Sequence, residues 1–455
     1  MVVTVVPLHQ KSERMKRTFY ILLFLTTLPS MAHEAWTIEK CIQYAVNHNH
    51  DVRLQALALE ESRIDRTKAV GAFLPSVNGS IGGQYNFGRA IDPETNTYTD
   101  VSTFYNGYSL SASIPVFDGF QRYNDLRASK ANILLGRSRL QAQKDQTAQD
   151  VLASYIELLY CKGSVEIARK KRDESMMLLR QTEVMAQVGR KSEADVSQMR
   201  ATYASDDYEV THQQSLYDKA LIALKRQMNF PMEDTLCVAD CDTCDMAEPT
   251  LMESPETIYS QAGHFNPRIR QAEYNLQAAR YSLRASKGAL YPSLNIGAGI
   301  STRYNKQLHK AGAIGFSEQF RNNAGEYISA TLSIPLFDRL STISSIRKSR
   351  NNVRRAEEEL DNNRRELHRL VSETYCDRAN SLKEMEKMRR RVEADSVALK
   401  QTVRKYEEGL SSAIDVQTQA VTLLQSEALL LQCRLTFIFK TRLLQYYKGI
   451  PLWTE

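Results

Sequence analysis

A six-residue motif occurs twice in the chain, and its two copies divide the sequence into two similar halves. Residues 113–118 read Ser-Ile-Pro-Val-Phe-Asp, and residues 333–338 read Ser-Ile-Pro-Leu-Phe-Asp. Each copy follows a stretch of alternating apolar and small polar residues and precedes a long charged stretch with apolar residues at helical spacing. Proline cannot donate to a sheet ladder, so each copy marks the end of a strand. We expect Asp118 and Asp338 to cap the helices that follow.

Other matches between the halves keep the same order. Residues 290–294 (Leu-Tyr-Pro-Ser-Leu) match residues 73–77 (Phe-Leu-Pro-Ser-Val), and residues 266–270 match residues 49–53. Each half reads as a helix, two strands, a long helix and a returning helix, which indicates a duplicated unit. We predict a first repeat at 33–230, an acidic linker with cysteines at 231–257, and a second repeat at 258–450.

Four stretches alternate with a period of two and predict strands. They lie near 77–87, 104–114, 294–301 and 328–334, with loops expected at 91–102 and 305–325. One face of each strand is apolar and the other carries small polar residues, which suits a wall between lipid and water. Four strands cannot close a barrel alone, so their edges must pair with other copies of the chain.

The helical stretches are unusually long. Residues 121–187 contain no proline, and Gly189 follows them where a helix-ending glycine is expected. A helix of that length measures roughly 100 Å, too long for one globular core. The second repeat has an equivalent helix at about 342–406, ended by Gly409. Shorter helices are expected at 36–71, 192–228 and 413–448. The predicted fold class is mainly α with β: internally duplicated, with long α-helical coiled coils and four β-strands.

The N-terminal 32 residues have the pattern of a secretory signal peptide. Four basic residues precede the apolar run 19–28, and Ser30-Met31-Ala32 follows it. That run is too short to span a bilayer as a helix. The net charge of +6 is modest for 455 residues, and basic residues such as Arg354, Arg355, Arg364 and Arg365 alternate with acids on one helix. This pattern is typical of solvated helix faces, and we expect no binding to nucleic acid.

The seven cysteines fall into two groups. Cys237, Cys241 and Cys244 lie in the acidic linker, where an exported chain would form one disulfide within the trio. Metal binding by the trio is the alternative. The other four lie on predicted helices, where we expect small buried residues: Cys41, Cys161, Cys376 and Cys433.

Three common catalytic motifs are absent from the sequence. It has no phosphate-binding glycine loop, no His-Glu-x-x-His and no nucleophile elbow. We therefore expect neither an enzyme nor a bound cofactor or metal.

The doubled motifs resemble those of the TolC family of outer-membrane efflux channels. The resemblance rests on the two strand starts with Pro-Ser, the doubled Ser-Ile-Pro-x-Phe-Asp, and two Gly-x5-Asp turns. It implies a homotrimer with a twelve-stranded transmembrane barrel and a helical tunnel across the periplasm of a Gram-negative bacterium. It also implies three partners: outer-membrane lipid, a periplasmic adaptor, and an inner-membrane pump or secretion transporter. The exported substrates would be small molecules or proteins.

The resemblance also implies site residues. Asp195, Tyr406 and Asp415 fall where family members narrow the periplasmic end of the tunnel. Helix capping by the two aspartates and helix packing by Tyr406 are alternative roles. The turns after the two longest helices are expected to contact the adaptor: Val188, Gly189, Arg190, Glu408, Gly409 and Leu410.

A second function remains open from the sequence alone. Long exported coiled coils also occur in soluble periplasmic adaptors and scaffolds. Such a protein needs no strands with an apolar lipid-facing side, so the predicted strands favour the channel.

Overall fold

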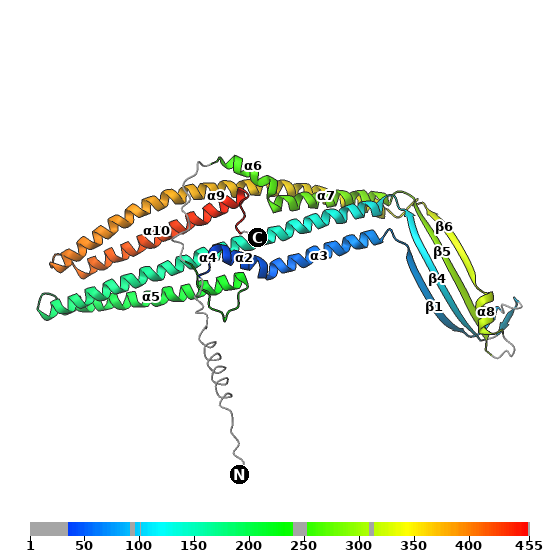
Figure 1. Ribbon diagram of the computed structural model, residues 1–455, viewed down its shortest axis with the longest axis horizontal. Helices are drawn as coiled ribbons and strands as arrows, with labels where there is room; N and C mark the ends of the chain where they lie inside the picture. The colour runs from blue at the N-terminus through cyan, green and yellow to red at the C-terminus, as the bar shows by residue number, and fades with distance from the viewer. Residues whose placement is uncertain (1–34, 92–95, 101, 240–252, 309–313, 454–455) are drawn as a thin grey trace, which may run out of the picture.

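The computed structural model describes residues 35–91, 96–100, 102–239, 253–308 and 314–453. Figure 1 shows an elongated molecule with a bundle of long helices and a sheet at one end. The predicted signal peptide and Cys241 and Cys244 lie outside the described residues. Among the described helices, none combines the length and apolar character needed to cross a membrane.

The elements follow the predicted order twice. The first half contains α2 (Ile38–His48), α3 (His50–Gly71), β1 (Ser76–Asn86), β4 (Thr103–Phe117), α4 (Gln121–Gln187) and α5 (Glu193–Met228). The second contains α6 (Pro255–Phe265), α7 (Pro267–Gly288), β5 (Ser293–Gln307), β6 (Gly325–Ser333), α9 (Ser341–Glu407) and α10 (Ala413–Tyr447). The predicted fold class is confirmed, whereas the repeat boundaries at 230 and 258 stay a prediction.

Some local predictions were wrong. The expected loop at 91–102 contains β3 (Tyr98–Asp100), which pairs with β2 (Arg89–Ile91) at the start of that loop, and the expected loop at 305–325 contains α8 (Phe316–Asn322). Helix α6 begins at Pro255, inside the predicted linker, because the Ser254 side chain accepts a hydrogen bond from the backbone N–H of Thr257. The initial helix is two helices, because Asn49 is extended and its Oδ1 accepts from the N–H of Asp51 at 2.8 Å.

The turn from strand to long helix has the same form in both halves. Phe120 and Leu340, not the aspartates, occupy the N-cap positions, both with left-handed φ angles near +65°. The carboxylates still serve the first turn. Asp118 Oδ2 accepts from the N–H of Arg122 at 3.1 Å, and Asp338 Oδ2 accepts from the N–H of Thr342 at 2.7 Å. The capping prediction is therefore right in function and wrong in position.

The sheet is antiparallel in the order β1-β4-β5-β6. The two hairpins have equivalent registers, with Ser76 opposite Ser113 in one and Ser293 opposite Ser333 in the other. The strands β4 and β5 join the two halves of the chain, with Ser113 opposite Gly297. Within the described residues, β1 and β6 each pair on one side only.

The two faces of the sheet differ in chemistry, as predicted. One face exposes large apolar side chains, including Ile81, Ile328 and Leu332. The opposite face carries serine ladders, in which Ser80 Oγ lies 2.8 Å from Ser109 Oγ. Register places the residues of each kind on the same side in all four strands.

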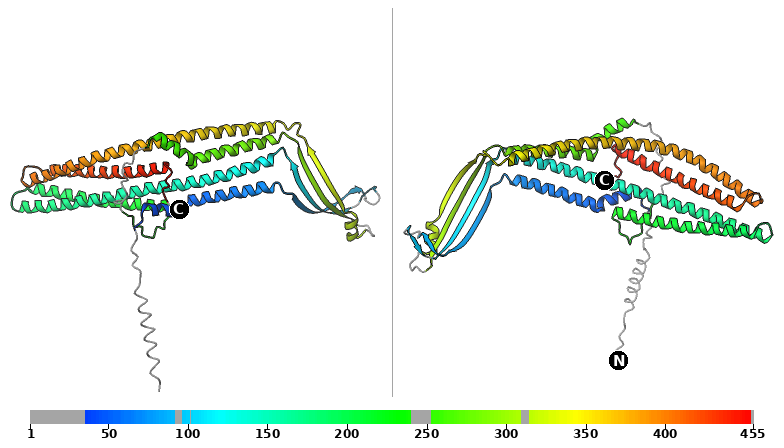
Figure 2. Two further views of the ribbon diagram at one scale, coloured as in Figure 1. Left: turned by 45° about the horizontal axis from the view of Figure 1, so that its top comes forward. Right: turned by 180° about the vertical axis from the view of Figure 1, so that it is seen from behind.

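The helices extend from the sheet as one curved layer, which Figure 2 shows from two sides. Near the sheet the neighbours are α3, α4, α7 and α9; at the far end they are α5, α4, α10 and α9. At mid-length α2 packs on α4 around Ile42, Leu152 and Leu158, and Trp453 closes this core. The backbone of Trp36 forms a parallel bridge with Val238, so the segment that precedes α2 and the first part of the linker meet at the same core.

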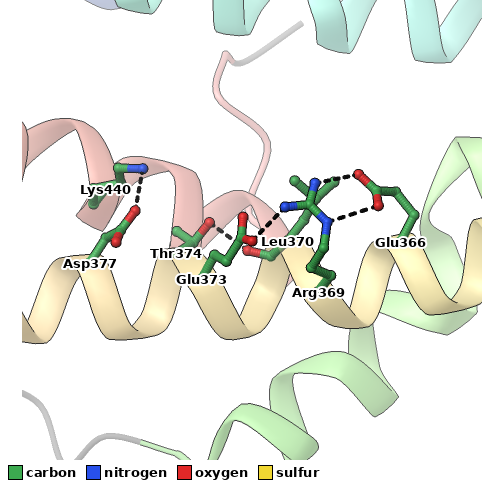
Figure 3. Close-up of polar contacts among 7 residues, drawn as sticks. All are labelled: Glu366, Arg369, Leu370, Glu373, Thr374, Asp377 and Lys440. Carbon is green, nitrogen blue, oxygen red and sulfur yellow. Dashed lines mark hydrogen bonds and ion pairs between the residues drawn. The ribbon is translucent and has the colours of Figure 1, made fainter.

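Figure 3 shows polar contacts of α9, one of which reaches α10 in the second hairpin. Arg369 binds Glu366 and Glu373 on its own helix, and Lys440 of α10 reaches Asp377 of α9 at 2.7 Å. Cys376 lies between Glu373 and Asp377 on α9. It is exposed, so the prediction that it is buried was wrong. Its position on α9 faces solvent because the apolar residues Leu367 and Val371 form the buried side of that helix.

The remaining helical cysteines agree better with expectation. Cys41 and Cys161 are buried and Cys433 is half-buried. Cys237 is exposed, and no disulfide joins two of the described cysteines. The predicted disulfide within the linker trio therefore stays a prediction.

Candidate tunnel gate and hairpin turns

The two turns between the long helices lie together at the end of the molecule farthest from the sheet (Figure 1). Gly189 has a φ of +75° and Gly409 a φ of +81°, conformations that cost other residues about 1–2 kcal/mol. Each glycine donates to the carbonyl three residues earlier, and the next residue donates to the carbonyl five residues earlier. Each turn exposes one large apolar side chain, Val188 in the first and Leu410 in the second.

Asp195 and Asp415 form the same structure one turn later. Each completes a capping box with a serine three residues earlier. Asp195 Oδ2 accepts from Ser192 Oγ at 2.8 Å, and Asp415 Oδ2 accepts from Ser412 Oγ at 2.7 Å. Hydrogen bonds from these serines lower the pKa of both carboxyl groups below 3.8. Both aspartates are therefore helix caps.

Tyr406 is buried at the same end, with an exposed fraction of 1%. Its hydroxyl oxygen lies 3.2 Å from Thr182 Oγ1 on α4. The Thr182 hydroxyl donates to the Leu178 carbonyl at 2.8 Å, so it accepts from Tyr406. Burial raises the pKa of Tyr406, which keeps its hydroxyl a proton donor.

Lys191 and the charge of Asp195 act on Tyr406, whereas the side-chain hydrogen bonds of Asp415 stay within its own turn. The Lys191 ammonium lies 3.5 Å from the centre of the Tyr406 ring, and its charge contributes to lowering the pKa of Asp195. The Asp195 charge in turn contributes to raising the pKa of Tyr406, after burial. The hydrogen bonds of the Asp415 side chain are with Ser411 and Ser412 of its own turn.

Sequence reasoning missed several residues of this site. Gln181 Nε2 donates to Glu407 Oε1 at 2.9 Å, and Gln198 Nε2 donates to Gln417 Oε1 at 3.0 Å. Both contacts join one hairpin to the other. Thr182 and Lys191 complete the surroundings of Tyr406. The two residues of each of these contacts between hairpins are more than 200 positions apart in sequence. The only sequence signal for Gln181 and Thr182 was that they lie in the last two turns of the helix before the predicted turn.

A cleft of about 510 Å³ separates the two hairpins above these contacts. Asp206 lines it with an exposed fraction of 5%, and its Oδ1 lies 3.0 Å from Lys171 Nζ. An apolar cluster of residues from both hairpins, which includes Met199, Tyr406 and Val416, also joins them at this end.

The pattern of elements and this doubled architecture match known proteins. A model of the outer membrane efflux protein family matches residues 41–229 and 258–437. The chain belongs to the outer membrane efflux protein family. The matched ranges fall on the two halves of the chain and leave out the whole predicted linker at 231–257.

Relatives of this outer membrane efflux protein cover most of its length. The outer membrane efflux protein BepC of Brucella suis biovar 1 is 23% identical over 396 residues, 87% of this chain and 81% of the relative. The pyoverdine export outer membrane protein OpmQ of Pseudomonas aeruginosa is 22% identical over 414 residues, 88% of this chain and 82% of the relative.

Solved structures show the same fold. A crystal structure of CusC superposes with a TM-score of 0.75 at 17% identity and covers 92% of each chain. The outer membrane protein VceC of Vibrio cholerae superposes with a TM-score of 0.70 at 16% identity, covering 91% of this chain and 95% of the other. As a member of its family this chain is an outer membrane efflux protein, and its location is the outer membrane.

Proposed function

We propose that three copies of this outer membrane efflux protein form a closed channel-tunnel. Twelve strands would make a barrel across the outer membrane of a Gram-negative bacterium, and the helices would continue it as a tunnel through the periplasm. The tunnel would receive small molecules or proteins from an inner-membrane pump or secretion transporter through a periplasmic adaptor. We propose no catalytic role, because the chain would act as a passage.

The pairing of β4 with β5 inside one chain carries the proposal. Strand β6 is the repeat equivalent of β4, and β1 is the equivalent of β5, yet neither pairs with the other within the chain. The same pairing between neighbouring copies would close the ring without any new geometry. In the observed β4–β5 pairing, Ser113 lies opposite Gly297. The residues at the equivalent positions of the other repeat are Ser333 for Ser113 and Ser80 for Gly297. The same pairing between copies would therefore place Ser333 of one copy opposite Ser80 of the next. Both serines belong to the polar face, which would line the lumen.

The strand–helix junction supports the same closure. Gly288 lies so close to the Gly119 carbonyl oxygen that an added Cβ would stand 2.8 Å from it. Its repeat equivalent, Gly71, has open space around it in the single chain. A neighbouring copy would fill that space with its equivalent corner at Arg339 and Leu340.

The gate is proposed at the far end of the tunnel. Tyr406 would hold the two hairpins of a chain together through Thr182, and opening would break this bond. In a trimer Asp195 and Asp415 would contribute six carboxylates near one axis, which favours cations over anions. Their serine caps already hold both carboxyl groups ionised, so the ring would keep its charge at neutral pH.

The adaptor is proposed to dock on the two turns. These lie farthest from the sheet and expose Val188 and Leu410 beside Arg190 and Glu408. Apolar tips flanked by opposite charges suit contact with another coiled coil. The alternative of a soluble periplasmic adaptor is not supported, since the sheet has an apolar outer face and the family is one of outer-membrane proteins.

Disulfide cross-linking tests the closure. In the variant Ser80→Cys/Ser333→Cys, opposite residues of neighbouring strands bring the two Cβ atoms within reach of a disulfide. We expect oxidised membranes to yield dimers and trimers on denaturing gels. The matched control Ser80→Cys/Leu332→Cys moves one thiol to the opposite face and should not cross-link. The single-cysteine variants control for the native cysteines.

Two further measurements bound the proposal. The mass of the detergent-extracted protein should be that of a trimer, and the protein should fractionate with outer membranes. A stable monomer, or recovery in the soluble periplasm, would contradict the channel.

A further inference from the structure

The helix segments next to the sheet carry an unusual concentration of positive charge. The last ten residues of α3 and α7 and the first ten of α4 and α9 contain twelve basic and two acidic residues. These forty residues have a net charge of +10, whereas the whole chain carries +6. We call these four segments (62–71, 121–130, 279–288 and 341–350) the basic collar.

The charge is specific to this end of the molecule. The four ten-residue segments that flank the hairpin turns at the other end (178–187, 193–202, 398–407 and 413–422) contain five basic and five acidic residues. Taken together, the helix ends beside the hairpin turns are therefore neutral, whereas the helix ends beside the sheet are strongly basic. A general preference for basic residues on these helices cannot explain the difference.

Most charges of the collar are unpaired. Eleven of its twelve basic side chains are exposed, and Arg122 is half-buried. Ion pairs hold Arg63, Arg122 and Arg280 to Glu60, Asp118 and Glu357. In the described part of the chain the other nine have no carboxylate within ion-pair distance. Such a surface is open to an anionic partner.

An apolar girdle lies between the collar and the strands. It consists of the exposed side chains of the strand–helix connections: Phe73, Leu74, Phe120, Tyr291, Leu336 and Phe337. Leu336 and Phe337 are 92% and 78% exposed. Arginines of the collar lie over aromatic rings at this boundary, Arg122 over Phe73 and Arg127 over Tyr123. Aromatic and apolar side chains that meet basic ones in this order are typical of a membrane–water interface.

We propose that the basic collar binds the headgroups of anionic phospholipids in the periplasmic leaflet of the outer membrane. The four segments reach the same level beside the sheet (Figure 1), each extending about 15 Å along its helix. Continuity with the apolar outer face of the sheet places them where headgroup phosphates lie. The inference rests on the proposed membrane position of the sheet and adds the chemical class of lipid.

The collar gives the channel a fixed depth in the membrane. Apolar strands define the membrane-spanning zone, and the collar resists both withdrawal into the periplasm and deeper insertion, because charged side chains remain with phosphates. Partners that bind the far end of the proposed tunnel would exert force on it, and the collar would keep its position in the membrane fixed. The preference is electrostatic, so it weakens as salt is raised.

Lipid selectivity of the purified full-length protein tests the proposal. The protein is reconstituted in phosphatidylethanolamine bilayers, and spin-labelled phosphatidylglycerol and phosphatidylcholine report which lipid occupies the shell around it. We expect the native protein to prefer phosphatidylglycerol. The variant Arg347→Gln/Lys348→Gln/Arg350→Gln should lower this preference at least about fivefold, the effect of one basic residue near an anionic surface.

A matched control lies on the same helix. The variant Lys383→Gln/Lys387→Gln/Arg389→Gln removes three exposed charges of α9 far from the sheet and should leave the preference unchanged. The variant Arg347→Lys/Arg350→Lys keeps the charge and should also retain it, which guards against a folding defect in the first variant.

Three outcomes overturn the proposal. One is a native protein without preference for phosphatidylglycerol, and another is a collar variant that keeps the preference. A third is a collar variant that changes ion selectivity in planar bilayers but not lipid preference, which would place these charges in the pore. Failure of the proposed function is seen separately, as absence of the protein from outer-membrane fractions.

Discussion

The hydroxyl of Tyr406 on α9 lies 3.2 Å from Oγ1 of Thr182 on α4, and this hydrogen bond joins the two long hairpins at their far end. The two residues are separated by 224 positions in sequence. Lys191 covers the Tyr406 ring from the first turn, so the contact includes both hairpins and one connecting turn. The proposed gate would open by breaking these polar contacts and the apolar packing around Tyr406, without unfolding a helix.

Removing the Tyr406 hydroxyl should favour the open tunnel. Tyr406→Phe keeps the ring packing and loses a hydrogen bond worth about 1 kcal/mol. We expect a higher single-channel conductance in planar bilayers, and Thr182→Val should give the same change. The control Tyr208→Phe alters a tyrosine that is 68% exposed on α5 and should conduct like the parent. Unchanged conductance in both gate variants would reduce Tyr406 to a packing residue.

Adding Asp195→Ala and Asp415→Ala to Tyr406→Phe should raise conductance further and weaken cation selectivity. The reason is the loss of a proposed ring of six carboxylates. The ratio of cation to anion permeability, from reversal potentials in a salt gradient, is the measurement. A triple variant with the selectivity of the parent would show that the aspartates act as helix caps alone.

Acid should loosen the two turns. Because hydrogen bonds from Ser192 and Ser412 lower the pKa of Asp195 and Asp415, the stabilisation is present above pH 3.8 and is lost as the pH falls through the lower folded values. Hydrogen exchange of the turn amides, corrected for the intrinsic rate, should therefore accelerate below pH 3.8. Ser192→Ala should cost that helix start about 1 kcal/mol and reduce this pH dependence at the first turn, because the side-chain donor to Asp195 is lost.

Changes at the turns should separate adaptor binding from membrane assembly. Gly409→Trp places a bulky side chain at a φ of +81° and should block complex formation while trimers still form. Leu410→Arg alters the exposed tip without that backbone strain, so it isolates the surface chemistry. Co-purification with the adaptor is the measurement. Normal complexes with bulky changes at both Gly189 and Gly409 would place the contact elsewhere.

The junction below the sheet should be intolerant of a single methyl group. In Gly119→Ala the new Cβ would stand 2.2 Å from the Gly288 carbonyl oxygen, at a φ of +66°. We expect a loss of at least about 2 kcal/mol, seen as a lower thermal unfolding temperature. The control Gly263→Ala has open space and an ordinary helical φ, so its effect should be small. Equal stability of the two variants would mean that the junction relaxes.

Local sequence patterns were sufficient for the elements but not for all of their contacts. The helix α4 was predicted with its observed bounds, because an unbroken helical stripe ends at a glycine whose conformation is left-handed. The Asp118 cap was placed two residues from the true N-cap, because Gly119 and Phe120 both adopt left-handed φ angles that the sequence does not signal. Cys376 was misjudged because helical spacing alone does not reveal which side of α9 is covered.

The sequence by itself determined the duplicated order of helices and strands and the two chemical faces of the sheet. The order of elements follows from helix and strand signals within a few residues of each other, which recur in both halves. The two faces of the sheet follow from the alternation of apolar and polar residues along each strand. Only the tertiary structure decided that Thr182 meets Tyr406, that β4 pairs with β5, and that four distant basic segments form one collar. Such relationships depend on how the helices and strands pack across hundreds of positions, and no local period encodes that packing.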